Sequence, residues 1–186
     1  MSALKRNWGW IVATLIVAAA VHIASVFYLP HIIMWRAMKG ISGAAGVNRM
    51  AYGKRPTAAS RGVVRPSPDL LYASCVFDLS KTGGLWVQAH DMPDTYWSIS
   101  VFDADTNNFD VINDRQAKGG RVQFLVVGPG WDKPMPFTVV HAPTMRGLVL
   151  VRTLINDERK LAAIDAARRH VTCAAYGSIT PWPPER

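Results

Sequence analysis

The stretch from Trp8 to Leu29 constrains this chain most, because its 22 residues include no Asp, Glu, Lys or Arg. At about 1.5 Å of rise per residue, a helix of this length extends ~33 Å and matches the ~30 Å hydrocarbon core of a bilayer. A cleaved signal peptide has an apolar region of only about 7–15 residues and ends at a site flanked by small residues. The residues around Ala24 and Leu29 fit such a cleavage site poorly. The stretch therefore predicts an uncleaved transmembrane anchor.

Polar and aromatic residues in and beside this stretch favour contact with a membrane and with a membrane protein. Aromatic rings at the ends of a span prefer the interface, and an ionisable residue within it is a candidate for bonding to a partner helix. Small side chains on one stripe would let such a helix approach closely, and this sequence offers Ala13, Val17, Ala20 and Ala24. The predicted membrane or partner contacts are Trp8, Trp10, His22, Tyr28, Trp35, Arg36 and Lys39.

The positive charge of the chain is concentrated near its N-terminus. The net charge is +8, yet residues 1–68 hold nine Lys or Arg and no acid, whereas residues 69–186 hold twelve basic and thirteen acidic residues. A nucleic-acid-binding domain carries its excess charge on the folded body. Here the excess flanks the apolar stretch, which indicates a membrane surface and no nucleic acid.

The side of the membrane on which the domain lies is not fixed by charge, because basic residues flank the apolar stretch at both ends. The short N-terminal tail resembles a signal anchor, so we expect a single-pass protein of the inner (cytoplasmic) membrane with a periplasmic domain. Cys75 and Cys173 agree with an oxidising compartment, where they could form one disulfide. Two buried free thiols are the alternative. No Cys/His spacing indicates zinc, and we expect neither a metal nor a cofactor.

The composition divides the chain into four parts. They are a cytoplasmic tail and transmembrane anchor (1–29), an amphipathic segment and basic extended linker (30–64), a β-domain (65–178) and a tail (179–186). In the second part, Met34, Met38 and Ile41 recur at helical spacing. This stripe predicts either a short amphipathic helix at the membrane surface or a helix that packs on the domain.

From Asp69 onward, apolar residues alternate with polar ones in short runs that Gly, Pro and Asp clusters separate. This period of two is typical of half-buried strands, and the even spacing of the turns favours an antiparallel β-sandwich or jelly roll. Residues 156–170 interrupt the pattern as a helix, with Asn156 or Asp157 as its cap. The predicted fold is mainly β, with an N-terminal transmembrane helix and one C-terminal α-helix.

Four motifs follow one another in the predicted domain: DLLYAS from Asp69, DADTNNF from Asp103, VGPGW from Val127, and APT from Ala142 with RT at Arg152. In order and spacing they resemble motifs of the bacterial domain-of-unknown-function 1254 proteins, over residues 65–155. The resemblance implies an envelope-exposed β-sandwich, often followed by a second β-domain of the 1214 family of unknown function. That second domain is not found in this sequence, an anchor precedes the first, and Leu70 replaces the usual threonine. The resemblance implies no reaction.

The acidic and amide residues from Asp103 to Asp114 could suggest a calcium loop, because several fall at the ligand positions of an EF-hand. Asn108, however, stands where that loop needs glycine, and the flanks read as strands. We instead predict a strand end followed by an Asx-rich connection in which Asp and Asn side chains bond to the local backbone. Asp103 and Asn107 are also candidates to pin the neighbouring strand, and the rim of the connection is a candidate part of a ligand pocket.

The period of two places Arg152 on the same strand face as Leu148, Leu150 and Leu154, and a cation on an apolar face requires a partner. One interpretation is a buried ion pair with Asp69, Asp78 or Asp103. The other is a clamp for a carboxylate or phosphate inside the sandwich, with Tyr72, Tyr96, Trp97 and Asp69 as its wall. The ligand-binding candidates are Asp69, Tyr72, Tyr96, Asp103, Asn107 and Arg152.

These observations favour a non-catalytic accessory module of the envelope. It would bind a small ligand or dock on an integral membrane partner. The alternative is a hydrolase-like envelope enzyme with a polar site around Asp69, Tyr72, Asp103 and Arg152. A triad of Ser98, His90 and Asp94 can be drawn, but no nucleophile motif supports it, and no catalytic residue is assigned.

Overall fold

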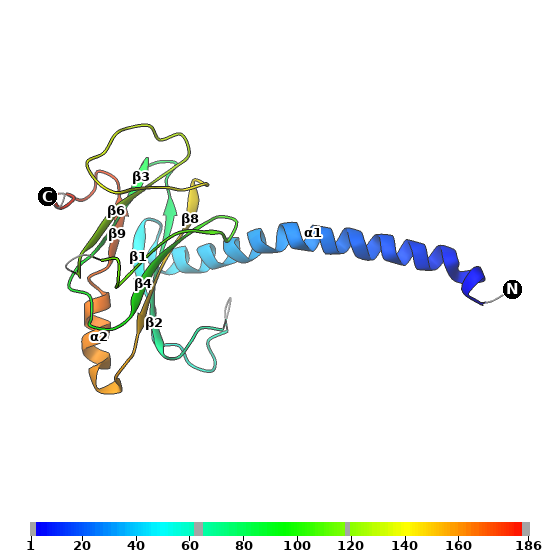
Figure 1. Ribbon diagram of the computed structural model, residues 1–186, viewed down its shortest axis with the longest axis horizontal. Coiled ribbons are helices and arrows are strands. Elements are labelled where there is room, and N and C mark those ends of the chain that lie inside the picture. Colours follow the sequence, from blue (N-terminus) through cyan, green and yellow to red (C-terminus); the bar gives the residue numbers. More distant parts are fainter. Residues whose placement is uncertain (1–2, 62–64, 118–119, 184–186) are drawn as a thin grey trace.

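The computed structural model describes residues 3–61, 65–117 and 120–183. A long helix, α1 (Ala3–Ala45), projects from a sandwich of two β-sheets, as Figure 1 shows. The strands are β1 (Arg49–Tyr52), β2 (Leu70–Asp78), β3 (Gly84–Ala89), β4 (Trp97–Asp103), β5 (Asn108–Asn113), β6 (Val122–Val127), β7 (Val139–His141), β8 (Arg146–Leu154) and β9 (Thr172–Ala175). Before β9 lie a 3₁₀ turn, η2 (Glu158–Lys160), and a short helix, α2 (Leu161–Arg168).

The five-stranded sheet has the order β1-β2-β8-β4-β5, and the four-stranded sheet has the order β7-β6-β3-β9. All neighbouring strands are antiparallel except β6 and β7, which pair in parallel. Apolar side chains of both sheets fill the space between them, among them Phe77, Val87, Ile99 and Phe124. The predicted fold class, a mainly β sandwich with an apolar N-terminal helix and a C-terminal helix, is confirmed.

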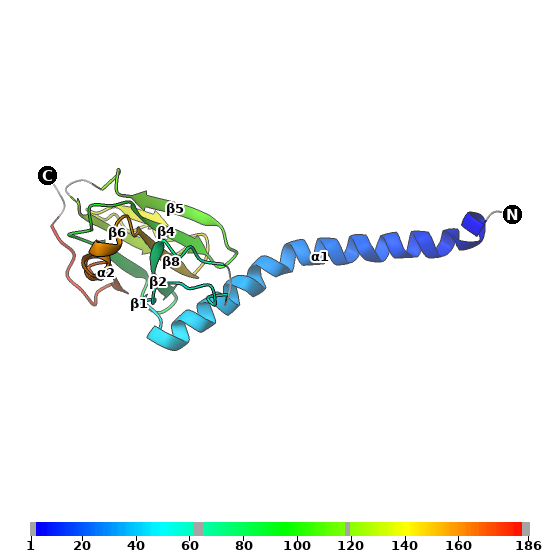
Figure 2. The ribbon, with the colours of Figure 1, turned by 90° about the horizontal axis from the view of Figure 1, so that it is seen from below.

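Helix α1 continues through Pro30 rather than ending there. Proline costs a helix one backbone hydrogen bond and favours a bend, and Figure 2 shows a helix that curves gently along its length. The segment after Pro30 is therefore not a separate amphipathic helix. Its apolar stripe packs on the domain, the second of the two interpretations offered by the sequence.

The contact between α1 and the domain is small and specific. Met34, only 5% exposed, packs with Val76 of β2 and Leu148 of β8. Nearby, Nε2 of His31 lies 2.9 Å from Oδ1 of Asp105, in the turn between β4 and β5. His31 Nδ1 also lies 2.9 Å from the carbonyl oxygen of Phe27. These contacts fix the direction in which the helix leaves the sandwich.

Two elements of the sandwich differ from the expected organisation. The predicted linker contains β1, whose residues Arg49–Tyr52 pair with Val76–Ala73 of β2, so the sandwich begins well before residue 65. The predicted C-terminal helix starts as a 3₁₀ turn, and its cap is Asp157, which accepts a hydrogen bond from the backbone N–H of Arg159 at 3.0 Å.

Arg168, at the end of α2, is the largest buried charge of the sandwich, with 2% of its surface exposed. Its guanidinium donates to the carbonyl oxygens of Tyr72 and Gly53 and to the carboxylate of Asp165. Burial opposes ionisation of Asp165, but hydrogen bonds and charge from Arg168 and Arg169 outweigh it and hold its pKa below the usual value. Arg168 therefore joins α2 to the start of the five-stranded sheet.

Candidate functional site

The outer face of the five-stranded sheet carries three parallel rows of side chains. The pairing register aligns Tyr72 of β2, Arg152 of β8 and Ser98 of β4 in one row. The next row holds Ser74, Leu150 and Ser100, and the third holds Val76, Leu148 and Phe102. Helix α1 packs on the third row. The polar character of this face thus increases with distance from the helix.

Arg152 lies half-buried in the polar row. Its Nη2 donates to Oγ of Ser100 at 3.2 Å. Its Nε and the Oγ of Ser98 are buried, and neither has a hydrogen-bond partner within residues 3–61, 65–117 and 120–183. Ser98 itself is only 2% exposed. The site therefore combines a cation with unused hydrogen-bonding capacity.

The predicted ion pair of Arg152 is wrong. Among the residues that the structure describes, no carboxylate pairs with Arg152. Asp78 instead accepts from Arg146 Nε at 2.8 Å, Asp103 is used by its own turn, and Asp69 is exposed just before β2.

The predicted position of the clamp inside the sandwich is also wrong. Val149, Val151 and Thr153 of β8 are fully buried and alternate with Arg152, so Arg152 points outward. Trp97, a predicted wall residue, alternates with Ser98 and lies in the core between the sheets.

Two other predicted ligand-binding residues, Tyr72 and Tyr96, lie on or next to strands of the same sheet. The Tyr72 hydroxyl, in the same row as Arg152, accepts from the backbone N–H of Ser67 at 3.0 Å. Tyr96, which immediately precedes β4, has 45% of its surface exposed. Ser98 and Ser100 could not be assigned to this group from the sequence alone, because only the register of β4 against β8 brings them beside Arg152.

Asp103 and Asn107 brace the turn between β4 and β5, as predicted. Oδ1 of Asp103 accepts from the backbone N–H groups of Asp105 and Asn107, both at 2.8 Å. Its Oδ2 accepts from Nδ2 of Asn107 at 2.8 Å. Thr106 holds a left-handed φ of 73°, which the turn requires. This carboxylate supports the turn, and the residues after it form β5.

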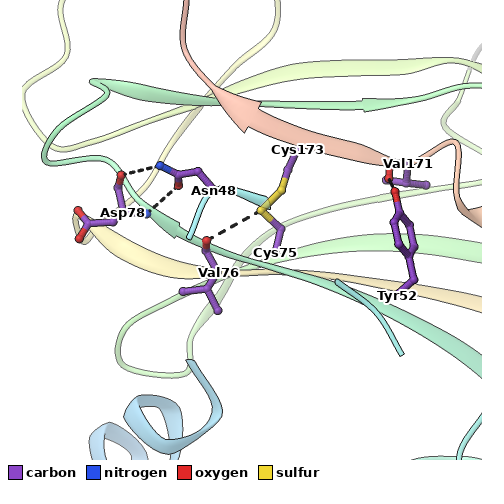
Figure 3. The surroundings of a disulfide bond; sticks show 7 residues. All are labelled: Asn48, Tyr52, Cys75, Val76, Asp78, Val171 and Cys173. Atoms are coloured by element: carbon purple, nitrogen blue, oxygen red, sulfur yellow. Dashed lines mark hydrogen bonds between the residues drawn. A yellow bond between two sulfur atoms is a disulfide. The ribbon is translucent and has the colours of Figure 1, made fainter. Parts of the chain in front are cut away.

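A disulfide joins Cys75 of β2 to Cys173 of β9 and therefore links the two sheets, as Figure 3 shows. Of the two alternatives for these cysteines, the structure has the disulfide and not two free thiols. Next to it, Tyr52 donates to the carbonyl oxygen of Val171 at 2.7 Å. Burial raises the pKa of Tyr52, although the charges of Arg169 and Arg168 oppose this rise. Together these bonds hold the β1–β2 edge against β9.

The drawn triad is not formed. Ser98 Oγ has no partner in the described part of the chain, and His90 Nδ1 lies 2.9 Å from Asp91 Oδ2. Asp94 meets Asn156 through its backbone carbonyl oxygen. A separate open cleft of about 400 Å³ lies at the start of β6, lined by residues that include Arg121, Gln123, Phe137, Thr138 and Trp182.

The part of α1 before Pro30 is apolar and exposed. From Arg6 the helix is long and apolar enough to cross a membrane, with a mean hydropathy of 2.2 in its most apolar window and none of that window buried. All the predicted membrane or partner contacts along α1 are exposed. Four of them precede Pro30, namely Trp8, Trp10, His22 and Tyr28, and three follow it, namely Trp35, Arg36 and Lys39.

Two solved structures resemble this one. The VPA0106 protein from Vibrio parahaemolyticus aligns with a TM-score of 0.57 and 15% identity, over 84% of this chain and 40% of that chain. An uncharacterised protein from Burkholderia cenocepacia aligns with a TM-score of 0.47 and 17% identity, over 62% of this chain and 35% of that chain. The chain thus spans less than half the length of either protein, and the first likeness shows the fold alone. No curated protein matches the sequence.

The sequence profile of a protein family described as "Protein of unknown function (DUF1254)" matches residues 47–175. This match begins beside β1 and ends with β9, so it covers the whole sandwich. Because it also covers more than half of the chain, the protein belongs to the DUF1254 family.

Proposed function

We propose that this protein is a single-pass, membrane-anchored binding module whose sandwich lies outside the cytoplasm and takes an anionic group of its ligand at Arg152. Among the residues that the structure describes, no carboxylate pairs with Arg152 and its buried Nε has no hydrogen-bond partner, and this observation carries the proposal. The ligand class is a molecule that presents a carboxylate or phosphate. The module acts by binding and carries out no reaction.

The exposed apolar part of α1 supports the anchor. Residues Trp8–Leu29 make no contact that buries them, and water is a poor solvent for such a surface. Met34, which packs on the domain, lies only five positions after Leu29, so about 7.5 Å of helix joins the end of the apolar stretch to the sandwich. The domain would therefore rest directly on the membrane surface.

The disulfide supports a location outside the cytoplasm. Structural disulfides persist in oxidising compartments such as the periplasm and are rare in the reducing cytosol. Both cysteines of the chain are used in the Cys75–Cys173 bond, and both are buried. The anchor and this location together support a placement in the inner membrane.

The geometry at Arg152 supports an anionic ligand. Arginine offers planar N–H donors that match a carboxylate or phosphate, and such charge-assisted bonds are stronger than neutral ones. In the described part of the chain, neither Nε of Arg152 nor the hydroxyl of Ser98 has a hydrogen-bond partner. The row that holds both residues lies on the sheet face on which α1 packs. A ligand group that reached both atoms would give each of them a hydrogen-bond partner.

The test compares wild type with Arg152→Ala by measuring thermal stabilisation of the detergent-solubilised chain in phosphate, sulfate, acetate and citrate. A hydrogen bond to a charged group contributes about 1.5–3 kcal/mol, so we expect Arg152→Ala to weaken the best anion roughly 10- to 150-fold. Bound anion raises the midpoint of unfolding, so this loss appears as a smaller rise.

Arg146→Ala is the matched control, because Arg146 lies on the same strand but is exposed and already paired with Asp78. This variant should keep the full anion-dependent rise. The proposal fails if Arg152→Ala responds to the anions as wild type does, or if no anion stabilises the wild type.

A further inference from the structure

Two histidines lie close together where strand β3 ends and the neighbouring strand β9 of the four-stranded sheet begins. His90 directly follows β3, and His170 lies two residues before β9. Because β3 and β9 pair antiparallel, with Gln88 opposite Thr172, the two histidines lie at the same edge of the sheet. Their rings are stacked, with centroids 4.8 Å apart and planes 6° from parallel.

Asp91 completes the group from the loop that follows β3. Its Oδ2 lies 2.9 Å from Nδ1 of His90, and its backbone adopts a left-handed φ of 47°. His90, Asp91 and His170 each offer one ligand atom, and all three atoms lie within 4.8 Å of one another. Two imidazoles and one carboxylate form a donor set that suits zinc.

An independent observation comes from His170. Its Nδ1 is buried and has no hydrogen-bond partner in the part of the chain that the structure describes. A buried polar atom without a partner is unfavourable, and coordination of a metal ion is one way in which such an atom is satisfied. The other groups around the cluster are Trp182, whose ring lies edge-on to His90 at 5.7 Å, and Arg121, which lies over Trp182 at 5.9 Å.

We propose that His90, Asp91 and His170 bind one Zn²⁺ ion. Zinc bonds of about 2.0–2.2 Å place ligand atoms roughly 3.3–3.6 Å apart. The widest separation between ligand atoms, at most 4.8 Å, must therefore close by about 1 Å. One imidazole must also turn so that the two lone pairs converge. Both histidines are half-buried, and Asp91 is exposed. Three protein ligands leave the fourth position open to water or to a small ligand.

The proposal is tested by calorimetric titration of Zn²⁺ into the full chain in detergent, with the disulfide intact and phosphate absent. We expect one ion per chain in the wild type. His90→Ala and His170→Ala should each weaken binding at least 100-fold, and Asp91→Asn about tenfold. The exposed Asp91 provides a variant that leaves the buried packing intact, so its result remains readable if a histidine variant folds poorly.

His141→Ala is the matched control, since His141 is an exposed histidine at the end of β7 outside this cluster. It should bind Zn²⁺ as the wild type does. Equal binding by the wild type and by a His90→Ala/His170→Ala double variant would overturn the proposal. So would a loss of binding in His141→Ala as large as that in His90→Ala, or no binding to the wild type at 100-µM Zn²⁺, about the weak limit of a specific site.

Discussion

Replacing Cys75 and Cys173 together by alanine is expected to lower the free energy of unfolding of the sandwich by about 4–5 kcal/mol. The bond closes a loop with a sequence separation of 98 residues, so reduction releases a large amount of chain entropy in the unfolded state. It also joins β2 of one sheet to β9 of the other, so the expected loss affects the packing of the two layers. Urea unfolding of the full chain in detergent, followed by tryptophan fluorescence, measures this loss.

The reduced wild type is the control for the cysteine variant. If the bond acts mainly on the unfolded chain, thiol reduction and the double substitution should lower the unfolding free energy by similar amounts. A loss below about 1 kcal/mol in both would contradict the importance that we assign to this bond, since a native disulfide in a secreted domain typically contributes 2–5 kcal/mol.

Replacing Arg168 by leucine is expected to cost about 3–5 kcal/mol of stability, the usual cost of breaking a buried ion pair from one side. The substitution leaves Asp165 without its closest cation and leaves the carbonyl oxygens of Tyr72 and Gly53 without a donor. A lysine cannot reproduce these bonds, because its ammonium lacks the planar fork that reaches all three acceptors. Urea unfolding of Arg168→Leu and Arg168→Lys checks both expectations.

Arg169→Ala is the matched control, because Arg169 shares Asp165 but has 52% of its side chain exposed. Exposed pairs contribute at most about 1 kcal/mol. The lowered pKa of Asp165 also predicts how stability depends on pH. The contribution of Asp165 to the free energy of unfolding is present above the ordinary aspartate pKa of about 3.9 and is lost as the pH falls through the folded-state value. Equal losses in Arg168→Leu and Arg169→Ala would contradict the structural role of Arg168.

The features that could be predicted from the sequence are those with local causes. An uncharged apolar stretch gives a helix, alternation gives a strand, and Asp103 bonds to backbone groups within four residues of it. The stripe of Met34, Met38 and Ile41 was also readable. The surface on which this stripe packs could not be predicted, because Val76 and Leu148 lie far from it in the sequence.

The features that escaped prediction depend on contacts between distant segments. Strand β1 has four residues and no clear pattern of its own, and its place follows from pairing with β2. Arg168 could be read as an ordinary basic residue at a helix end, because nothing local indicates that Tyr72 and Gly53 surround it.

Arg152 illustrates a third limit. Alternation correctly placed it with Leu148 and Leu150, but alternation alone does not say which face of a strand is the interior. The mostly apolar face with Arg152 turned out to be the outer one, partly covered by α1, whereas Val149 and Val151 fill the core. The proximity of His90 to His170 could not be predicted for a related reason, since only the β3–β9 pairing brings the two histidines together.

The central claim is that the anchor places the disulfide-bonded sandwich outside the cytoplasm, and site-directed labelling tests it most directly. Because both native cysteines are bonded, a single cysteine introduced at the exposed Lys133 would carry the only free thiol. In intact spheroplasts, a membrane-impermeant maleimide should label Lys133→Cys without detergent and should label Ser2→Cys only after detergent is added. Labelling in the reverse order would place the domain in the cytoplasm and contradict the account.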